Sequence, residues 1–141
     1  MRLSLHKGGT RPDEEGDKGL HRCRYGLLPH LQGFGGETVI QPAYCFNYRP
    51  FLKAGRAETA SLAQIDCDHV IMETVKPCED GEKAYILRLY EAAGDWAKVQ
   101  LSFGHPVKGI SLCNMLEEEE EAAGQQITFR PFEIKTLKIY Y

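Results

Sequence analysis

Hydrophobic and polar residues alternate between residues 69 and 94 with the period of two that is typical of half-buried β-strands. The alternation predicts a first strand over 70–76 and a second over 85–92. In the first strand, Ile71 and Val75 fall on one face. The opposite face carries Val70, Met72 and Thr74.

The second strand has an equally clear division. One face carries Tyr85, Leu87 and Leu89, and the other carries Ile86, Arg88 and Tyr90. Between the two strands lies PCEDGEK, residues 77–83, in which Pro fixes φ and Asp-Gly tolerates a positive φ. The two strands are therefore predicted to form a β-hairpin.

The remaining pattern favours short strands joined by loops of a few residues. Further strands are predicted over 61–65, 97–103, 108–113, 126–130 and 132–139. Before them, we expect a strand over 20–28 and a short helix over 36–46, weakened by Pro42. The chain is therefore predicted to be all-β, with an antiparallel β-sandwich.

Net charge divides the chain near residue 53. Residues 1–52 carry seven Lys/Arg and five Asp/Glu, whereas 53–141 carry ten and fifteen. This shift predicts one unit over 1–52 and a second over 53–141. Roughly fifty residues with so few elements cannot close a sandwich alone, so the first unit is expected to pack on the second, on another chain or on an absent domain.

Several motifs resemble the late part of the family-38 glycoside hydrolases, the α-mannosidases. They are Asp17-Lys-Gly-Leu-His21, Tyr25-Gly-Leu-Leu-Pro-His30, Asn47-Tyr-Arg-Pro50, Glu73-Thr-Val-Lys-Pro77, Tyr85-Ile-Leu-Arg-Leu-Tyr-Glu91 and Phe129-Arg-Pro-Phe-Glu-Ile-Lys-Thr-Leu137. They follow the family's order over nearly the whole chain. Cys23 departs from the family, which usually has an aromatic residue there.

The resemblance implies that 1–52 are the trailing strands and short helix of a large β-sandwich, and that 53–141 are a small terminal β-sandwich. It implies a non-catalytic module that packs on an α-mannosidase catalytic domain and shapes its cleft. The parent enzyme would hydrolyse α-mannosides with retention in glycan catabolism, using zinc held in the catalytic domain. Nothing in this chain matches that domain, so no catalytic residue and no cofactor are expected here. The alternative is a free-standing β-sandwich that binds carbohydrate or a protein partner.

One loop is the best candidate for sugar contact, since the resemblance places it near the catalytic cleft. Its residues are Lys7, Asp13, Asp17 and His21. Charged donors and acceptors on a Gly-rich loop suit the vicinal hydroxyls of mannose-containing glycans. The alternative is that 17–19 form only the turn before the 20–28 strand. Tyr90 and Trp96 could stack on a pyranose ring, but strand aromatics are more often core residues.

Two clusters resemble cation sites without their spacing. Residues 66–69, Asp-Cys-Asp-His, offer zinc-type donors but no fourth partner, so we expect a turn and no metal site. His21 and Cys23 are interpreted in the same way. The run of five glutamates, 117–121, lacks the Gly and Asx residues of a calcium loop, and we expect a solvated loop or helix start.

Composition narrows the function classes. A net charge of −3 without a basic stripe argues against a nucleic-acid partner. No apolar run is long enough for a membrane span, and the start becomes polar too soon for a secretory signal. Five scattered cysteines favour a reduced, cytoplasmic protein. A module separated from its parent is expected to expose a contiguous apolar surface, which offers a contact for homo-oligomers.

Overall fold

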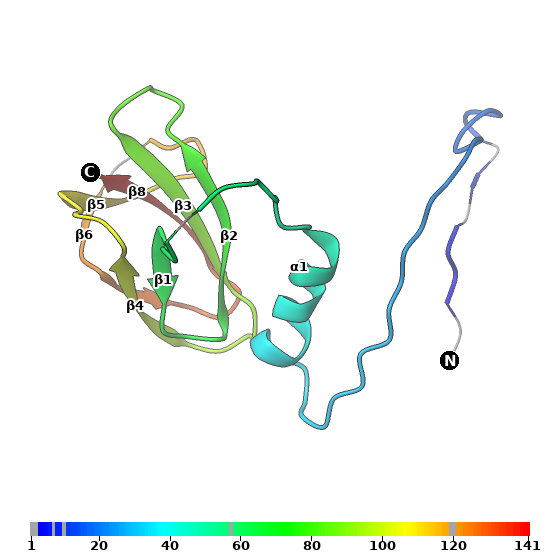
Figure 1. Cartoon of the computed structure of the whole chain (residues 1–141), viewed down its shortest axis with the longest axis horizontal. Coiled ribbons are helices and arrows are strands. Elements are labelled where there is room, and N and C mark those ends of the chain that lie inside the picture. Colours follow the sequence, from blue (N-terminus) through cyan, green and yellow to red (C-terminus); the bar gives the residue numbers. More distant parts are fainter. Residues whose placement is uncertain (1–2, 7, 10, 57, 119–120) are drawn as a thin grey trace.

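The computed structural model describes residues 3–6, 8–9, 11–56, 58–118 and 121–141. Figure 1 shows a β-sandwich, a short helical segment beside it, and an extended segment that leads away from both. Two antiparallel sheets form the sandwich, which confirms the predicted fold class. Among the described residues, the helices are too short and too polar to cross a bilayer.

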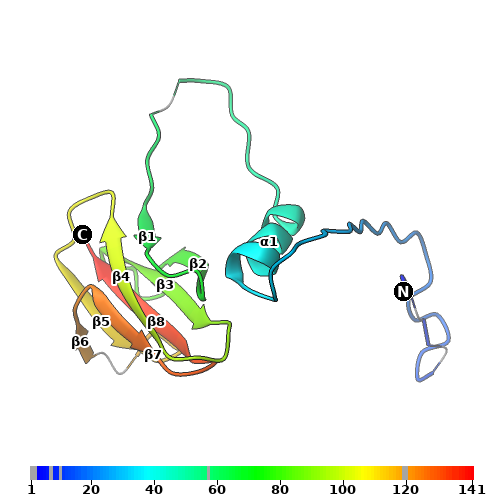
Figure 2. The ribbon, with the colours of Figure 1, turned by 90° about the horizontal axis from the view of Figure 1, so that it is seen from below.

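The sandwich pairs a three-stranded sheet with a five-stranded sheet (Figure 2). The smaller sheet has the order β1-β4-β7, with β1 Ala63–Ile65, β4 Ala97–Phe103 and β7 Gln126–Phe129. The larger sheet has the order β2-β3-β8-β5-β6, with β2 Val70–Pro77, β3 Ala84–Glu91, β8 Ile134–Tyr140, β5 Gly109–Cys113 and β6 Glu121–Ala123. Each strand predicted from residue 61 onward is present, with ends shifted by a few residues. β6 was not predicted.

The β2–β3 hairpin forms as predicted. The strands pair from Val70 with Glu91 to Pro77 with Tyr85. In the connecting loop Gly81 has φ +73°, a conformation that glycine adopts without steric cost. The hairpin therefore follows from its turn residues as well as from its alternating strands.

The main core lies between the two sheets. The face of β3 predicted to be apolar is buried there, because Tyr85, Leu87 and Leu89 are 7%, 0% and 1% exposed. The opposing sheet contributes Val99, Leu101, Ile127 and Phe129. Every second residue of β4 from Ala97 to Leu101 is buried, which matches its alternation. At about 25 cal/mol per Å² of apolar area, burial of these side chains is the dominant stabilising term.

A β-bulge changes the predicted faces of β2. The register against β3 shifts between Met72 and Thr74. Met72 pairs with Leu89 on the core side, whereas Thr74 pairs with Arg88 on the outer side and Val75 with Leu87. The prediction that Ile71 and Val75 share a face, with Met72 and Thr74 on the other, is therefore wrong. An extra residue inverts the alternation beyond it.

The outer face of the five-stranded sheet holds a second, smaller core. Cys78, Ala84 and Ile86 are buried there. Lys138 is 1% exposed, and its ammonium lies 2.6 Å from the Asp80 carboxylate and 3.1 Å from that of Glu82. The hairpin loop that carries these two acids therefore covers the sheet and neutralises a buried cation.

The glutamate run is not simply a solvated loop. Glu117 is buried, with φ +68°, and its carboxylate lies 2.6 Å from Lys76 Nζ. It also accepts a hydrogen bond from the backbone N–H of Glu79 at 2.9 Å. Glu118 is exposed and Glu121 begins β6, while 119–120 lie outside the described residues. The prediction is therefore wrong for Glu117, which forms an ion pair with Lys76 on β2.

A buried carboxylate joins two connections at one end of the sandwich. Glu91 is 1% exposed, and its carboxylate accepts hydrogen bonds from four backbone N–H groups: Ala93, Gly94, Asp95 and Phe132, at 2.7, 2.8, 3.3 and 3.0 Å. Burial acts to raise the pKa of Glu91, but the four hydrogen bonds outweigh it and the pKa is lowered. Glu91 thus fixes the β3–β4 loop and the turn before β8 together.

The helical segment forms where it was predicted. A π-helix, η1 Gly36–Ile40, continues directly into α1 Gln41–Asn47. Pro42 lies in the first turn of α1, directly after the junction with η1, and the helical segment continues past it to Asn47.

The strand predicted over 20–28 does not form. This stretch belongs to the extended arm, residues 11–35, where the structure shows no helix or strand. A strand requires a neighbour to satisfy its backbone N–H and C=O groups, and these nine residues pair with none of the described strands. The alternation was present, but the partner was not.

Trp96 was expected to be a core residue, and this is wrong. Its side chain is 65% exposed, just before β4. Tyr90 is half-buried, and its hydroxyl lies 3.2 Å from that of Tyr44 on α1. Tyr90 therefore connects the sandwich to the helical segment.

Candidate functional site

The loop predicted to contact sugar lies on the extended arm. Lys7 is outside the described residues. Asp13, Asp17 and His21 are exposed, and Figures 1 and 2 place this part of the chain far from the sandwich. The loop is therefore open to solvent or to a partner, and its contact with sugar stays a prediction.

Local hydrogen bonds bring two of the predicted residues together. His21 Nε2 lies 2.6 Å from the carbonyl oxygen of Asp17, a residue with φ +57°. Asp13 instead accepts a hydrogen bond from the N–H of Glu15 at 2.9 Å, the usual role of an aspartate at a turn. The turn lies at 14–17, closed by hydrogen bonds from the N–H of Gly16 to Asp13 O and from the N–H of Lys18 to Glu15 O, and not at 17–19 as the alternative had it. It leads into extended chain and not into a strand.

A larger concave feature lies between the helical segment and the sandwich. It is a cleft of about 750 Å³. The helical segment contributes Glu37, Gln41, Tyr44 and Cys45, and the sandwich contributes Ile65, Asp66, Cys67, Asp68, Val70, Ile71 and Met72. Its walls carry three carboxylates and two thiols, so the cleft suits a polar or cationic ligand better than an apolar one.

Two contacts hold the walls of this cleft. The backbone of Gly36 approaches the Asp68 carbonyl so closely that a Cβ on Gly36 would lie 1.7 Å from that oxygen. On the other side, Tyr44 and Tyr90 share the hydroxyl hydrogen bond described above. That bond is the largest cause, with burial and the nearby charge of Glu73, of a Tyr44 pKa raised to about 12. Only glycine fits at position 36, so the close backbone contact between Gly36 and Asp68 positions the helical segment against the sandwich.

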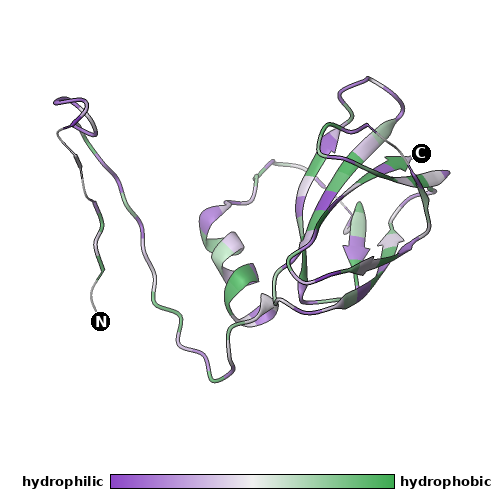
Figure 3. Ribbon diagram, turned by 180° about the vertical axis from the view of Figure 1, so that it is seen from behind, coloured by the Kyte–Doolittle hydropathy of each residue, from purple (hydrophilic) through white to green (hydrophobic). Residues whose placement is uncertain are grey.

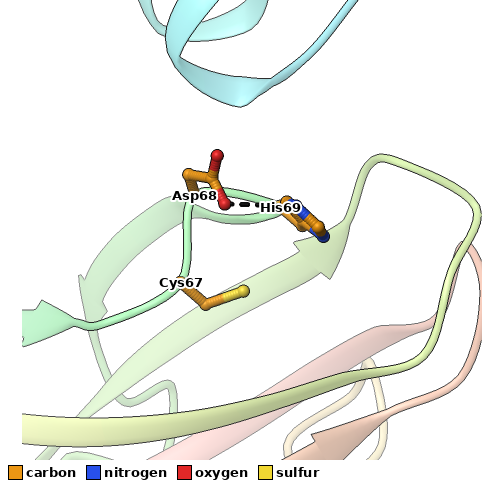
Figure 4. A group of neighbouring side chains, drawn as sticks. All are labelled: Cys67, Asp68 and His69. Carbon is orange, nitrogen blue, oxygen red and sulfur yellow. Dashed lines mark ion pairs between the residues drawn. The ribbon is translucent and has the colours of Figure 1, made fainter.

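The 66–69 segment forms the turn that was predicted. Asp66 Oδ1 accepts a hydrogen bond from the N–H of Gln100 on β4 at 2.7 Å, which ties the turn to the smaller sheet. Asp68 Oδ1 lies 3.2 Å from His69 Nε2 (Figure 4). The donor atoms of Cys67, Asp68 and His69 all lie within 4.8 Å of one another.

A second groove, of about 550 Å³, lies near the ends of β2 and β3. Its lining is mainly apolar and aromatic: Leu62, Val75, Lys76, Pro77, Ala84, Tyr85, His105 and Tyr141. Tyr85 Oη lies 3.3 Å from His105 Nε2, and the Tyr85 and Tyr141 rings are 5.7 Å apart. Burial, with a smaller effect of Tyr141, raises the pKa of Tyr85 to about 12. The hydroxyl therefore stays neutral and able to donate.

The acids with altered pKa values serve structural roles. Lys138 lowers the pKa of Asp80, and Lys76 lowers that of Glu117. For Glu133, burial opposes the hydrogen bonds from Arg130, which prevail and lower its pKa. A glycosidase general acid requires a raised pKa, so these carboxylates lack that property.

Neither the cleft nor the groove could be predicted from the sequence. Each combines residues that are distant in the chain, as with Glu37 and Asp68 in the cleft, or Val75 and His105 in the groove. Their assembly depends on how the helical segment and the β4–β5 loop dock. From the sequence alone, only the metal-type donors at 67–69 and the isolated aromatic residues were recognisable.

Comparison with known families identifies the sandwich. Residues 69–137 match the family described as the glycosyl hydrolases family 38 C-terminal beta sandwich domain. This stretch runs from the start of β2 into β8. The chain therefore contains a family-38 C-terminal β-sandwich domain, and the resemblance noted in its motifs is confirmed.

Individual relatives extend the match to the arm and the helical segment. Alpha-mannosidase 2C1 of Homo sapiens is 32% identical over 150 residues, covering 97% of this chain and 14% of the human protein. Alpha-mannosidase 2C1 of Mus musculus is also 32% identical, over 151 residues, with the same coverage. Alpha-mannosidase of Saccharomyces cerevisiae is 26% identical over 170 residues, covering all of this chain and 16% of the yeast protein. The chain is thus homologous to α-mannosidases over about a seventh of their length.

Proposed function

We propose that this chain acts as the non-catalytic C-terminal β-sandwich module of an α-mannosidase, supporting the catalytic domain and shaping its cleft. The observation that carries this proposal is the match to relatives named α-mannosidases over 97–100% of the chain but only 14–16% of their length. Such a match is expected of one module of a larger enzyme. Retaining hydrolysis of α-mannosides in glycan catabolism would then be the activity of the whole enzyme.

The exposed apolar residues of the arm support an association with further protein. Several large side chains there are more than half exposed: Leu20, Tyr25, Leu27, Leu28, Leu31 and Phe34. Figure 3 shows hydrophobic positions along this extended part of the chain, away from the sheets. Apolar side chains at this density are stabilised when a partner covers them. We propose that the α-mannosidase catalytic domain is this partner, and that a second copy of the chain can take its place when that domain is absent.

The catalytic zinc is proposed to lie in that domain, outside this chain. The loop with Lys7, Asp13, Asp17 and His21 is proposed to reach the cleft wall and to hydrogen-bond mannose hydroxyls. Location in the cytoplasm is proposed because the five cysteines are odd in number and scattered along the chain without a Cys-x-x-Cys pair. None of these roles requires chemistry from the sandwich itself.

A chimera tests the module role. This chain replaces the matching segment of human α-mannosidase 2C1, and hydrolysis of an aryl α-mannoside is compared with that of the same enzyme lacking the segment. We expect the chimera to hydrolyse the aryl α-mannoside faster than the shortened enzyme does. A chimera with Leu27→Asp and Leu28→Asp should lose this gain, whereas the exposed sandwich variant Lys98→Ala should keep it.

The module role would be wrong if the chimera were no more active than the shortened enzyme, while the human segment restored activity in the same assay. Separate measurement of chimera folding by circular dichroism distinguishes misfolding from failure to support catalysis. The Lys98→Ala variant controls for the effect of altering any exposed side chain.

The aromatic groove favours a second candidate function, carbohydrate binding by the sandwich. Tyr141, which is 42% exposed, and the neutral Tyr85 hydroxyl offer a ring face and a hydrogen-bond donor in one place. Titration with methyl α-mannoside, followed by NMR, tests this role. Shifts that saturate and disappear in Tyr141→Ala would favour it, and unchanged spectra at millimolar sugar would exclude it.

A further inference from the structure

The turn between the two sheets gathers three metal-binding side chains. β1 belongs to the smaller sheet and β2 to the larger one, and only residues 66–69 connect them. Asp68 and His69 lie in a turn. In an extended strand, by contrast, neighbouring side chains would point to opposite faces. The donor atoms of Cys67, Asp68 and His69 consequently lie within 4.8 Å of one another (Figure 4).

Their spacing is close to that required by a shared ion. Zinc lies about 2.0–2.3 Å from nitrogen, oxygen and sulfur ligands, so donors around one tetrahedral ion stand about 3.3–3.8 Å apart. Asp68 and His69 already approach to 3.2 Å. Small side-chain rotations would bring Cys67 Sγ into the same shell.

The donor types select the metal. A thiolate, an imidazole and a carboxylate together favour Zn²⁺ and its spectroscopic substitute Co²⁺, whereas Ca²⁺ and Mg²⁺ favour oxygen ligands alone. Asp66 is engaged by the N–H of Gln100, which holds the turn and leaves the next three residues to bind. The carboxylate of Asp66 therefore acts as a support for the turn.

The surroundings leave space for the ion and for a further ligand. Cys67 and Asp68 line the cleft of about 750 Å³, and the opposite wall carries Glu37 and Cys45. The side chains of His69 and Asp68 are 46% and 49% exposed, so an ion can reach them from solvent. Water, Glu37 or Cys45 can supply the fourth ligand.

We propose that Cys67, Asp68 and His69 form a binding site for Zn²⁺ or Co²⁺ at the junction of the helical segment and the sandwich. On binding, the Cys67 thiol loses its proton to solvent and forms the metal–sulfur bond. The Asp68–His69 contact is replaced by bonds from both side chains to the metal. Metal binding here is independent of the role in an α-mannosidase proposed above.

Cobalt titration of the full chain under reducing conditions tests the site. We expect one Co²⁺ per chain, with near-ultraviolet thiolate-to-cobalt charge-transfer absorption that zinc abolishes by displacement. Cys67→Ser should remove the charge-transfer band, and His69→Ala should weaken binding by at least about tenfold, since loss of a direct ligand costs no less than loss of a supporting residue. Cys23→Ser, a matched change of an exposed cysteine on the arm, should leave both unchanged.

The outcomes separate this site from binding by scattered thiols. Absence of a charge-transfer band at millimolar Co²⁺ would overturn the proposal, and so would a band that persists in Cys67→Ser. Circular dichroism of each variant establishes that the sandwich is folded. Loss of the band in Cys67→Ser with affinity reduced in Cys45→Ser would support the site and identify Cys45 as its fourth ligand.

Discussion

The sandwich and the extended arm use similar apolar side chains in opposite ways. Leu87 in β3 is 0% exposed between two sheets, whereas Leu27 in the arm is 76% exposed. Both lie in stretches where large apolar residues recur at short intervals. The difference is whether neighbouring strands are present to cover them. Within one chain, the same residue type thus stabilises one region by burial and remains exposed to solvent in another.

Limited proteolysis should separate the two regions most strongly. Trypsin is expected to cut at Lys18, Arg22 and Arg24 at least about 1000-fold faster than at sites within 63–140, since cleavage in the sandwich requires unfolding. Mass spectrometry of timed digests measures the order. Cleavage that spared residues 1–52 and removed the sandwich would reverse the comparison.

Matched leucine substitutions should show the next largest difference. Leu87→Ala is expected to lower the free energy of unfolding by about 2–5 kcal/mol, because it removes a fully buried side chain and leaves a cavity. Leu27→Ala should change it by less than about 0.5 kcal/mol. Urea denaturation of both variants provides the measurement, and equal effects would mean that the arm packs on the sandwich in solution.

Glu91→Gln should destabilise the sandwich by about 2–4 kcal/mol. The substitution replaces a buried acceptor of four N–H groups with an amide that cannot accept from all of them. Glu58→Gln, an exposed change in the connecting segment, is the matched control. Equal urea midpoints for the two variants would show that the Glu91 hydrogen bonds add no stability.

The same variant defines a pH dependence. The folded-state pKa of Glu91 lies below its ordinary value of 4.5. Its contribution is therefore complete above pH 4.5 and is lost as the pH falls through the lowered folded-state pKa. The stability difference between wild type and Glu91→Gln should shrink over that range. Comparison with the variant cancels the effects of Asp80, Glu117 and Glu133, whose pKa values are also lowered.

A glycine pair gives the smallest expected difference. Gly94 has φ +78°, and an added Cβ would lie 2.6 Å from Phe132 Cζ. Gly94→Ala should cost about 1 kcal/mol, since the ring of the exposed Phe132 can move aside. Gly19 in the arm has φ +131° and no atom within 4 Å of such a Cβ. Gly19→Ala should leave the melting temperature unchanged, and a comparable decrease would contradict the independence of the arm.

Alternation predicted most of the sandwich because strands such as β4 bury one face and expose the other. It failed where structure depends on a distant neighbour. The bulge between Met72 and Thr74 is defined by register against β3, and the strand predicted over 20–28 lacks a partner among the described strands. Glu117 became buried because Lys76 lies beside it, a pairing between residues 41 positions apart.

The candidate sites, too, could be predicted from the sequence only where their residues are contiguous. The 66–69 turn and its donors are contiguous, so both were recognisable from the sequence. The cleft requires Gly36 to seat against Asp68, and the aromatic groove requires His105 to reach Tyr85. Such contacts are set by tertiary packing and leave no periodic signal.

The order of strands in the five-stranded sheet has a consequence for synthesis. β8 lies between β3 and β5, although it is the last of these strands to leave the ribosome. Until residues 134–140 emerge, the β2–β3 and β5–β6 pairs each present an open edge of unpaired backbone groups. Completion of the sheet is therefore a late, single insertion, and the nascent domain needs protection from edge-to-edge association until then.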